Sequence, residues 1–301
     1  MVKIVTVGSI AFDSIKTPFG AAEKVIGGSA VFSSLAAGLF AKTGVVGVVG
    51  TDFGAHNLSR LEKKGVDVQG VTVGEGKTFS WKGFYEYDMN VAHTVETNLN
   101  VFSSFDPVVP ESYRKADFLF LGNISPKLQL SVLEQMKKRP KLVVSDTMNY
   151  YIEREPENVK EVIKEVDIGL MNDAEARQLF GTPSLVQAAK KILELDSKYA
   201  IIKKGEHGAV LFSHGSFFSV PAFPLEKVVD PTGCGDSFAG AFLGFLAIAG
   251  KINEKNIRKA MVYGSAVASI NAQDFSISAL EKTTRKQVEK RFKEFRKMVE
   301  F

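Results

Sequence analysis

Residues 228–242 read VVDPTGCGDSFAGAF, an apolar strand end followed by a turn of small residues and the start of an apolar helix. The small residues 233–235 allow several backbone N–H groups to point at one place, at the positive end of that helix, which suits phosphate or another anion. Asp236 is the unexpected residue, because a carboxylate among such donors competes with phosphate. Its presence makes chemical sense if it takes a proton from a hydroxyl group that attacks the phosphate. A helix-capping aspartate is the structural alternative.

The same residues resemble the C-terminal signature of the ribokinase-like (PfkB) carbohydrate kinases, D-[TP]-[TN]-G-[AC]-G-D-x-F-x-G. The resemblance implies that Asp236 is the general base that deprotonates the acceptor hydroxyl group. It also implies that Gly233, Cys234 and Gly235 hold the transferring phosphoryl group through their N–H groups. A thiol nucleophile at Cys234 is the alternative, but its neighbours indicate that the loop needs a small side chain there.

Two N-terminal segments resemble the acceptor site of the same family. Residues 5–13 read VTVGSIAFD, and we predict a first strand that runs into a glycine turn and ends at Asp13. Gly27, Gly28 and Ser29 open a helix predicted to extend through residue 40; the glycines let backbone approach a ligand, and the serine can cap the helix. The resemblance implies that these three residues and Asp13 hold the acceptor.

Phe32 departs from the family pattern, because many members carry an asparagine there that grips a sugar hydroxyl group. The departure leaves the general reaction intact, but it weakens the inference of ribose and favours an acceptor with an apolar or planar face. A core position on an amphipathic helix is an equally good explanation of Phe32.

A second group of motifs resembles the nucleotide side of these kinases. Asn172 and Glu175 match the family's Asn-x-x-Glu, which arranges magnesium, largely through water, and the ATP phosphates; the same spacing is also an ordinary helix-capping pattern. In the strand–turn–strand at residues 200–210, Lys203 or Lys204 can reach phosphate, and the turn is glycine-rich. The turn residues that give the nucleotide room are Gly205 and Gly208.

Two further residues of the signature carry a metal prediction. Asp230 and Thr232 match the positions at which some family members bind potassium.

The order of apolar runs predicts an α/β fold. Strands at 45–49, 118–121, 141–145 and 168–171 alternate with helices at 55–64, 128–138 and 157–165, and apolar helices follow at 257–270 and 285–299. The last of these is expected to pack on the core; an acidic partner surface is the alternative. The resemblance implies a ribokinase-like three-layer α/β/α sandwich with a mostly parallel central sheet and a small β-sheet lid. We expect one kinase domain over residues 1–301, with the lid built from about 12–18 and 71–103; a plain β extension is the alternative.

Composition excludes several classes of protein. The chain has 301 residues, a formal net charge of +4 that is spread along it, one cysteine and four histidines without metal-ligand spacing. Nucleic-acid binding, a disulfide and a zinc site are therefore not expected. We expect no signal peptide, no membrane span and a cytoplasmic protein. Residues 74–78 read GEGKT, but Val71 stands where a P-loop needs glycine.

The sequence therefore predicts an enzyme that moves the γ-phosphoryl group of ATP, with magnesium, to a hydroxymethyl group of a sugar or polyol. The alternative within the fold is a nucleoside kinase of the adenosine type. A regulator that binds nucleotide or sugar without catalysis is a third reading, against which the intact Asp236 argues. The partners expected are the small-molecule acceptor and, through the lid, a second copy of the chain.

Overall fold

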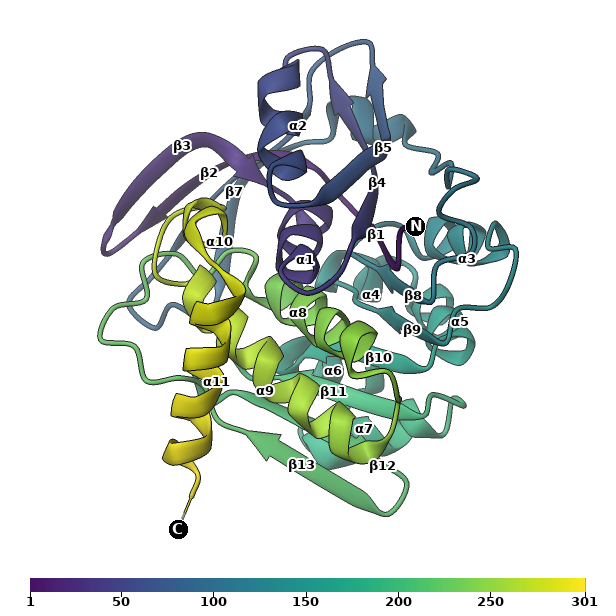
Figure 1. Ribbon diagram of the computed structural model, residues 1–301, viewed down its shortest axis with the longest axis vertical. Coiled ribbons are helices and arrows are strands. Elements are labelled where there is room, and N and C mark those ends of the chain that lie inside the picture. The colour runs from purple at the N-terminus through teal and green to yellow at the C-terminus, as the bar shows by residue number, and fades with distance from the viewer. Residues whose placement is uncertain (301) are drawn as a thin grey trace.

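A nine-stranded sheet forms the centre of the computed structural model, which describes residues 1–300 (Figure 1). The strand order is β13-β12-β11-β10-β9-β8-β1-β4-β5, and all neighbours from β11 to β5 are parallel, whereas β12 and β13 are antiparallel additions. The strands are β1 (Ile4–Val7), β4 (Thr43–Gly50), β5 (Val66–Gly74), β8 (Phe118–Leu121), β9 (Leu142–Ser145), β10 (Ile168–Asn172), β11 (Tyr199–Lys203), β12 (Ala209–Ser213) and β13 (Ser216–Val220).

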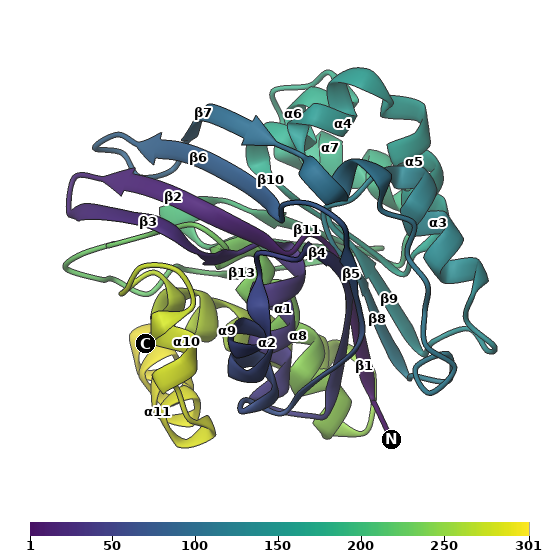
Figure 2. The same cartoon turned by 90° about the horizontal axis from the view of Figure 1, so that it is seen from above.

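Helices cover both faces of this sheet (Figure 2). One layer holds α3 (Pro126–Glu134), α4 (Asn149–Arg154), α5 (Pro156–Glu165), α6 (Asp173–Phe180) and α7 (Leu185–Leu193). The other holds α1 (Ser29–Gly38), α2 (Gly54–Glu62), α8 (Cys234–Ala249), α9 (Glu254–Asn271), α10 (Ser278–Lys282) and α11 (Arg285–Met298). Short 3-10 turns are η1 (Asn100–Ser104) and η2 (Gly205–His207). The three-layer architecture predicted from the sequence is confirmed.

The central strands are apolar throughout because both of their faces are buried. In β8, Phe118 and Phe120 belong to the core under α1, α8 and α9, whereas Leu119 and Leu121 belong to the core under α3 and α5. All eight residues of β4 are buried. Such unbroken apolar runs are typical of parallel strands between two helix layers, and the strands predicted at 45–49, 118–121, 141–145 and 168–171 are confirmed.

A second, four-stranded sheet projects from the large one (Figure 2). Its order is β3-β2-β6-β7, with β2 (Ala11–Thr17), β3 (Gly20–Gly27), β6 (Phe79–Tyr85) and β7 (Ala92–Asn98). The predicted bounds, 12–18 and 71–103, differ from these strands at two places. Residues 71–74 continue β5 and pair with β4 in the large sheet, and β3, which the sequence analysis did not foresee, adds a strand. We call these four strands the lid.

The first predicted strand is in fact two strands. β1 ends at Val7, the chain turns over residues 8–10, and β2 enters the lid. Asp13 therefore lies within a lid strand rather than at the end of β1, and its position is set by pairing with Val25 in β3 and Trp81 in β6.

The C-terminal helix α11 packs on the core, as predicted. Val288 and Phe295 are buried in it, and the ring of Phe292 stacks on Tyr263 of α9 at a centroid distance of 4.3 Å. Over residues 1–300, none of the helices combines the length and the apolar character that crossing a membrane requires.

The helices α1 and α8 cross in close contact because a glycine lies between their backbones. A Cβ atom added to Gly240 would lie 2.1 Å from the backbone oxygen of Ser33. We predict that Gly240→Ala lowers the free energy of unfolding by about 1–3 kcal/mol, since backbone cannot yield to the added methyl group. Urea denaturation measures the loss.

Gly244→Ala, one turn further along α8, is the matched control. Its added Cβ meets the ring of Phe40 at 2.8 Å, and a ring can move aside more easily than backbone. An undiminished stability of Gly240→Ala, or a larger loss in Gly244→Ala, contradicts this account of the helix crossing.

Candidate active site

The loop before α8 presents unused backbone donors. Gly233, the residue before the helix, has a left-handed backbone with φ 72°, and α8 begins at Cys234. The N–H group of Cys234 donates to the Pro231 oxygen at 3.1 Å, whereas within residues 1–300 the N–H groups of Gly233 and Gly235 donate to no protein acceptor. Two of the three predicted donors, at the positive end of a 16-residue helix, are thus available to an anion.

The surroundings require glycine at position 233 and leave little room for a side chain at position 235. A Cβ atom on Gly233 would lie 2.3 Å from the ring of Phe32, and one on Gly235 would lie 2.9 Å from Nζ of Lys203. Phe32 is 1% exposed. It is a core residue that supports the loop from below, which answers the question that its departure from the family pattern raised.

The signature aspartate Asp230 anchors the loop. Its two carboxylate oxygens accept hydrogen bonds from the backbone N–H groups of Thr232 at 2.9 Å and Ser276 at 3.0 Å, and Asn271 donates to the Thr232 oxygen at 2.9 Å. Burial raises the pKa of Asp230. The structure thus gives Asp230 an anchoring role; potassium binding by Asp230 and Thr232 stays a prediction.

Cys234 serves as a small, half-buried residue. Burial raises the pKa of its thiol to about 12, and the thiol donates weakly to the Ala268 oxygen at 3.5 Å. A thiol with this pKa carries its proton at neutral pH and is a poor nucleophile.

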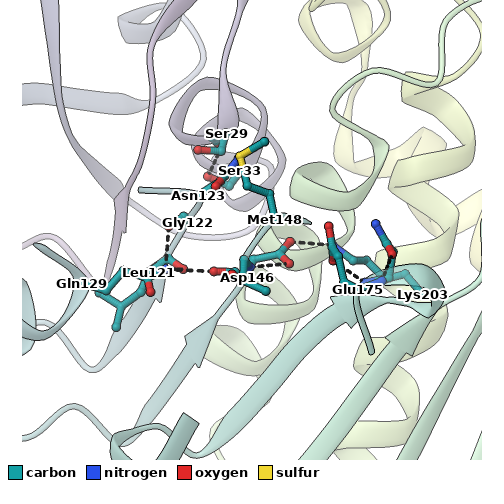
Figure 3. Close-up of polar contacts among 12 residues, drawn as sticks. Ser29, Ser33, Leu121, Gly122, Asn123, Gln129, Asp146, Met148, Glu175 and Lys203 are labelled. Carbon is teal, nitrogen blue, oxygen red and sulfur yellow. Dashed lines mark hydrogen bonds and ion pairs between the residues drawn. The ribbon is translucent and has the colours of Figure 1, made fainter. Parts of the chain in front are cut away.

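An ion pair lies beneath the loop (Figure 3). Nζ of Lys203, at the end of β11, is 2.5 Å from Oδ2 of Asp146, which follows β9, and the two side chains are only 17% and 6% exposed. Burial alone would lower the pKa of Lys203, but Asp146 and then Glu175 outweigh it and raise it. The sequence analysis missed Asp146, although a carboxylate directly after a buried parallel strand is the signal by which it could have been found.

Asn172 and Glu175 form the helix cap that their spacing allows. The Asn172 side chain accepts from the backbone N–H of Glu175 at 2.8 Å, and the Glu175 carboxylate accepts from the N–H of Asn172 at 2.7 Å. Glu175 also faces the ion pair, as Figure 3 shows. Burial and then the nearby Asp146 raise the pKa of Glu175 to about 8. The capping role and a place in the site therefore coexist.

Asp236 and Asp13 are desolvated carboxylates near one another. Burial, followed by Asp146, raises the pKa of Asp236 to about 7, while Lys203 opposes the shift. Burial, then Asp230 and Asp236, raise the pKa of Asp13 to about 8. Within residues 1–300 no protein donor is hydrogen-bonded to the Asp13 carboxylate, which is 4% exposed. The lid strand thus brings an unpaired acid to the signature.

The glycine pair beside Asp13 makes room for it. A Cβ atom on Gly27 would lie 1.8 Å from Oδ2 of Asp13, and one on Gly28, whose φ is 98°, would lie 2.4 Å from the Ser9 oxygen. The expectation that Ser29 caps α1 is wrong: Gly28 is the cap residue, with no side-chain cap. Ser29 instead exchanges two 3.1 Å hydrogen bonds with Ser9, which hold the turn between β1 and β2.

The turn after β11 has the form predicted for nucleotide binding. Gly205 and Gly208 have positive φ values of 53° and 83°, and the N–H of Lys204 donates to the Gly208 oxygen at 2.7 Å. Lys203 points under the signature loop, whereas Lys204 is half-buried at the turn. Of the two lysines, Lys203 is therefore the one beside the signature loop at residues 233–235.

The lid also meets the signature, through a contact that the sequence did not reveal. The hydroxyl groups of Tyr85, at the end of β6, and Thr232 are 3.2 Å apart. Thr17 of β2 donates to the Val229 oxygen at 2.9 Å. The lid is thus bonded to the segment that contains Asp236.

The donor set suits magnesium held mainly through water. Asp146 and Glu175 supply the hard oxygen atoms that magnesium prefers. Among residues 1–300, however, no three acidic, histidine or cysteine side chains gather closely enough to hold an ion directly. Water and phosphate oxygens would therefore complete the coordination shell.

Comparisons with known proteins identify related sequences and folds. The family model described as pfkB family carbohydrate kinase matches residues 1–284. A cytidine kinase of Thermococcus kodakarensis is 32% identical over 249 residues, which are 81% of this chain and 88% of that protein.

Solved structures show the same fold. The nucleoside kinase of Methanocaldococcus jannaschii superposes with a TM-score of 0.77 and 19% identity, covering 98% of this chain and 99% of that one. An Escherichia coli protein described as a ribokinase II, solved with ATP and Mg²⁺, gives a TM-score of 0.79 at 20% identity, covering 98% and 100%.

The raised pKa of Asp13 generates a prediction about stability. Because its pKa is about 8 in the folded state and 3.8 in the reference state, the folded protein binds more protons between these values, and wild-type stability falls as pH rises through that range. Asp13→Asn removes this effect. We expect the difference in the free energy of unfolding, variant minus wild type, to increase by on the order of 1–3 kcal/mol as the pH rises from 5 to 8. Urea unfolding at several pH values measures it.

Asp52→Asn should show the opposite pH dependence, losing stability relative to wild type as pH rises through the acid range. The hydrogen bonds from Thr78 to Asp52 outweigh burial and hold the pKa of this carboxyl below its usual value, so its contribution is present above pH 4 and lost in acid. A relative stability of Asp13→Asn that does not change with pH contradicts the desolvated state of Asp13.

Proposed function

Because the chain belongs to the PfkB family of carbohydrate kinases and is thus an ATP-dependent kinase, we propose that it phosphorylates the hydroxymethyl group of a nucleoside. The 32% identity to a cytidine kinase over four fifths of the chain supports this acceptor. The sugar or polyol that the sequence analysis placed first has weaker support, since the resemblance to a sugar kinase of Archaeoglobus fulgidus is 28% identity over 76% of the chain.

One observation carries the proposed chemistry: a carboxylate with a pKa of about 7 stands in the first turn of α8, beside the unused N–H groups of Gly233 and Gly235. A base with this pKa is substantially ionised at neutral pH and still holds a proton well. Asp236 takes the proton from the acceptor hydroxyl group as the acceptor oxygen bonds to the γ-phosphorus atom. The bond between that phosphorus and the oxygen that bridges it to the β-phosphate breaks, and ADP leaves. The two N–H groups stabilise the charge on the phosphoryl oxygens.

The acceptor is bound between the lid and α1 in this proposal. Within residues 1–300 no donor is hydrogen-bonded to the Asp13 carboxylate, which lies against Gly27. Hydroxyl groups of the ribose moiety supply the missing donors. Ser29 contributes by holding the neighbouring turn through Ser9.

The nucleotide is bound on the other side of the signature loop. Lys203 neutralises phosphate charge from beneath the loop, while Lys204 and the glycine turn at 205–208 border the nucleotide. Magnesium, when bound with ATP, adds positive charge that stabilises the phosphoryl oxygens. Asn172, Glu175 and Asp146 would hold its water shell.

Two finer features belong to the same proposal. Potassium at Asp230 and Thr232 would add a cation next to the loop that these residues anchor. A homodimer would form through the lid, whose edge strand β7 is mostly exposed and whose Val91 and Val95 are 52% and 60% exposed.

Loss of the base should remove most of the turnover but leave nucleotide binding unchanged. We expect Asp236→Asn to lower kcat by ~10²–10⁴, the usual contribution of a general base, while MgATP still binds. Coupled ADP release and calorimetry measure the two quantities. Asp117→Asn, a partly exposed carboxylate whose contacts are with Lys138 and Lys141, is the control and should keep wild-type turnover. Full turnover in Asp236→Asn refutes the assignment.

The acceptor can be identified by comparing nucleosides with their sugar. We expect kcat/KM for cytidine, uridine or adenosine to exceed that for ribose by at least about tenfold, because contacts to the base help to position the hydroxymethyl group. ADP release across nucleosides, pentoses, hexoses and inositols measures it. A sugar or polyol that outperforms every nucleoside restores the carbohydrate-kinase reading.

A further inference from the structure

The tip of the lid touches the turn proposed to bind the nucleotide. The connection between β6 and β7 carries Asn90, whose Oδ1 accepts from the backbone N–H of Glu206 at 3.3 Å and whose Nδ2 donates to the Glu206 carboxylate at 3.1 Å. The two residues are 116 positions apart in the sequence. The contact joins an acceptor-side element to a nucleotide-side element.

Both partners are shaped for this contact. A Cβ atom on Gly205 would lie 2.2 Å from Oδ1 of Asn90, so a side chain at position 205 would block the approach. On the lid, Asp88 orders the tip, since the N–H of Asn90 donates to its Oδ1 at 3.2 Å and the Asn90 side chain donates to its backbone oxygen at 2.8 Å. Asn90 is thus presented to the turn in a fixed orientation.

The same hairpin is also bonded to the signature loop. Tyr85 lies at the end of β6, five residues before Asn90, and its hydroxyl group is 3.2 Å from that of Thr232. Movement of the β6–β7 hairpin therefore changes contacts at Thr232 of the signature and at Glu206 of the turn after β11 together. By contrast, Asn90 and Glu206 are exposed. Exposed hydrogen bonds contribute little to global stability and exchange readily with water, which suits a contact that opens and closes.

We propose that Asn90 is a positioning residue that couples nucleotide binding to closure of the lid. ATP bound at residues 205–208 holds the turn in the form that Asn90 recognises, and the lid then closes over the acceptor. By linkage, the acceptor strengthens nucleotide binding by the same factor. The coupling rests on the proposed function, because it requires a nucleotide at this turn and an acceptor under the lid.

Hydrogen–deuterium exchange with MgATP alone tests the coupling without knowledge of the acceptor. In wild type, MgATP should slow exchange of the amides at residues 86–91 by about 2- to 10-fold, the range expected when one such hydrogen bond is stabilised. In Asn90→Ala this protection should vanish, while protection of residues 203–208 persists.

Asn98→Ala is the matched control. Asn98 lies in β7, and its side chain is hydrogen-bonded to Ser80 and Glu96 within the lid. This variant should keep the wild-type protection of the hairpin. Equal protection in Asn90→Ala and wild type, or no protection in either, overturns the coupling and leaves the kinase assignment standing. Absence of any MgATP binding to wild type overturns both.

An equilibrium binding measurement separates coupling from a merely structural role. With cytidine as the acceptor probe, its dissociation constant in wild type should fall when a non-hydrolysable ATP analogue is present. Asn90→Ala should reduce that factor by about 2- to 10-fold and leave the affinity for cytidine alone unchanged. A reduction equal to that in Asn98→Ala contradicts the role of Asn90.

Discussion

The ion pair between Lys203 and Asp146 is the interaction on which the rest of the site depends. Asp146 raises the pKa values of both Glu175 and Asp236, and Lys203 lowers both. Without the ammonium group these acids would face one another with no opposing charge, and removal of one partner from a buried pair typically costs about 3–5 kcal/mol. The pair also lies close to the loop, since a Cβ atom on Gly235 would lie 2.9 Å from Nζ of Lys203. Lys203 thus pairs with Asp146, favours the ionised forms of Glu175 and Asp236, and lies beside the loop at residues 233–235.

The parallel sheet explains why these groups meet. β9, β10 and β11 are neighbours in the sheet, and Asp146, Glu175 and Lys203 come from the ends of these strands or the residues just beyond them. Carboxyl ends of parallel strands lie along one edge, so side chains far apart in the sequence converge without any specific loop structure. α8 brings the signature to this edge from the opposite helix layer, and its glycine contact with α1 sets how closely it approaches. Asp146, Glu175 and Lys203 therefore stand on rigid elements, which keeps their distances fixed.

Sequence patterns predicted the elements well where burial alone determines them. The apolar runs of β4, β8, β9 and β10 specify buried strands, and the small residues at 233–235 specify the anion loop. The break between β1 and β2 was not predictable, because residues 5–13 continue the alternation of one strand while the chain passes between two sheets. Ser29 was misread as a cap because its true partner, Ser9, is distant in sequence. The position of Asp146 after β9 marks it as a strand-end carboxylate, but its pairing with Lys203 and the lid contacts of Tyr85 and Asn90 depend on tertiary neighbours that no local pattern contains.

Burial raises the pKa values of Asp13, Glu175 and Asp236, and these raised values affect both the charge of the site and its chemistry. Raised pKa values mean that Asp13 and Glu175 hold protons over much of the neutral range, so the site repels an incoming polyphosphate less than its count of carboxyl groups suggests. Burial and then Asp146 raise the pKa of Asp236 to about 7, and Lys203 and the residue's own backbone N–H group oppose that rise. A carboxyl group with this pKa is substantially ionised at neutral pH, as the proposed base requires. Lys203 thus opposes the rise in the pKa of both Asp236 and Glu175.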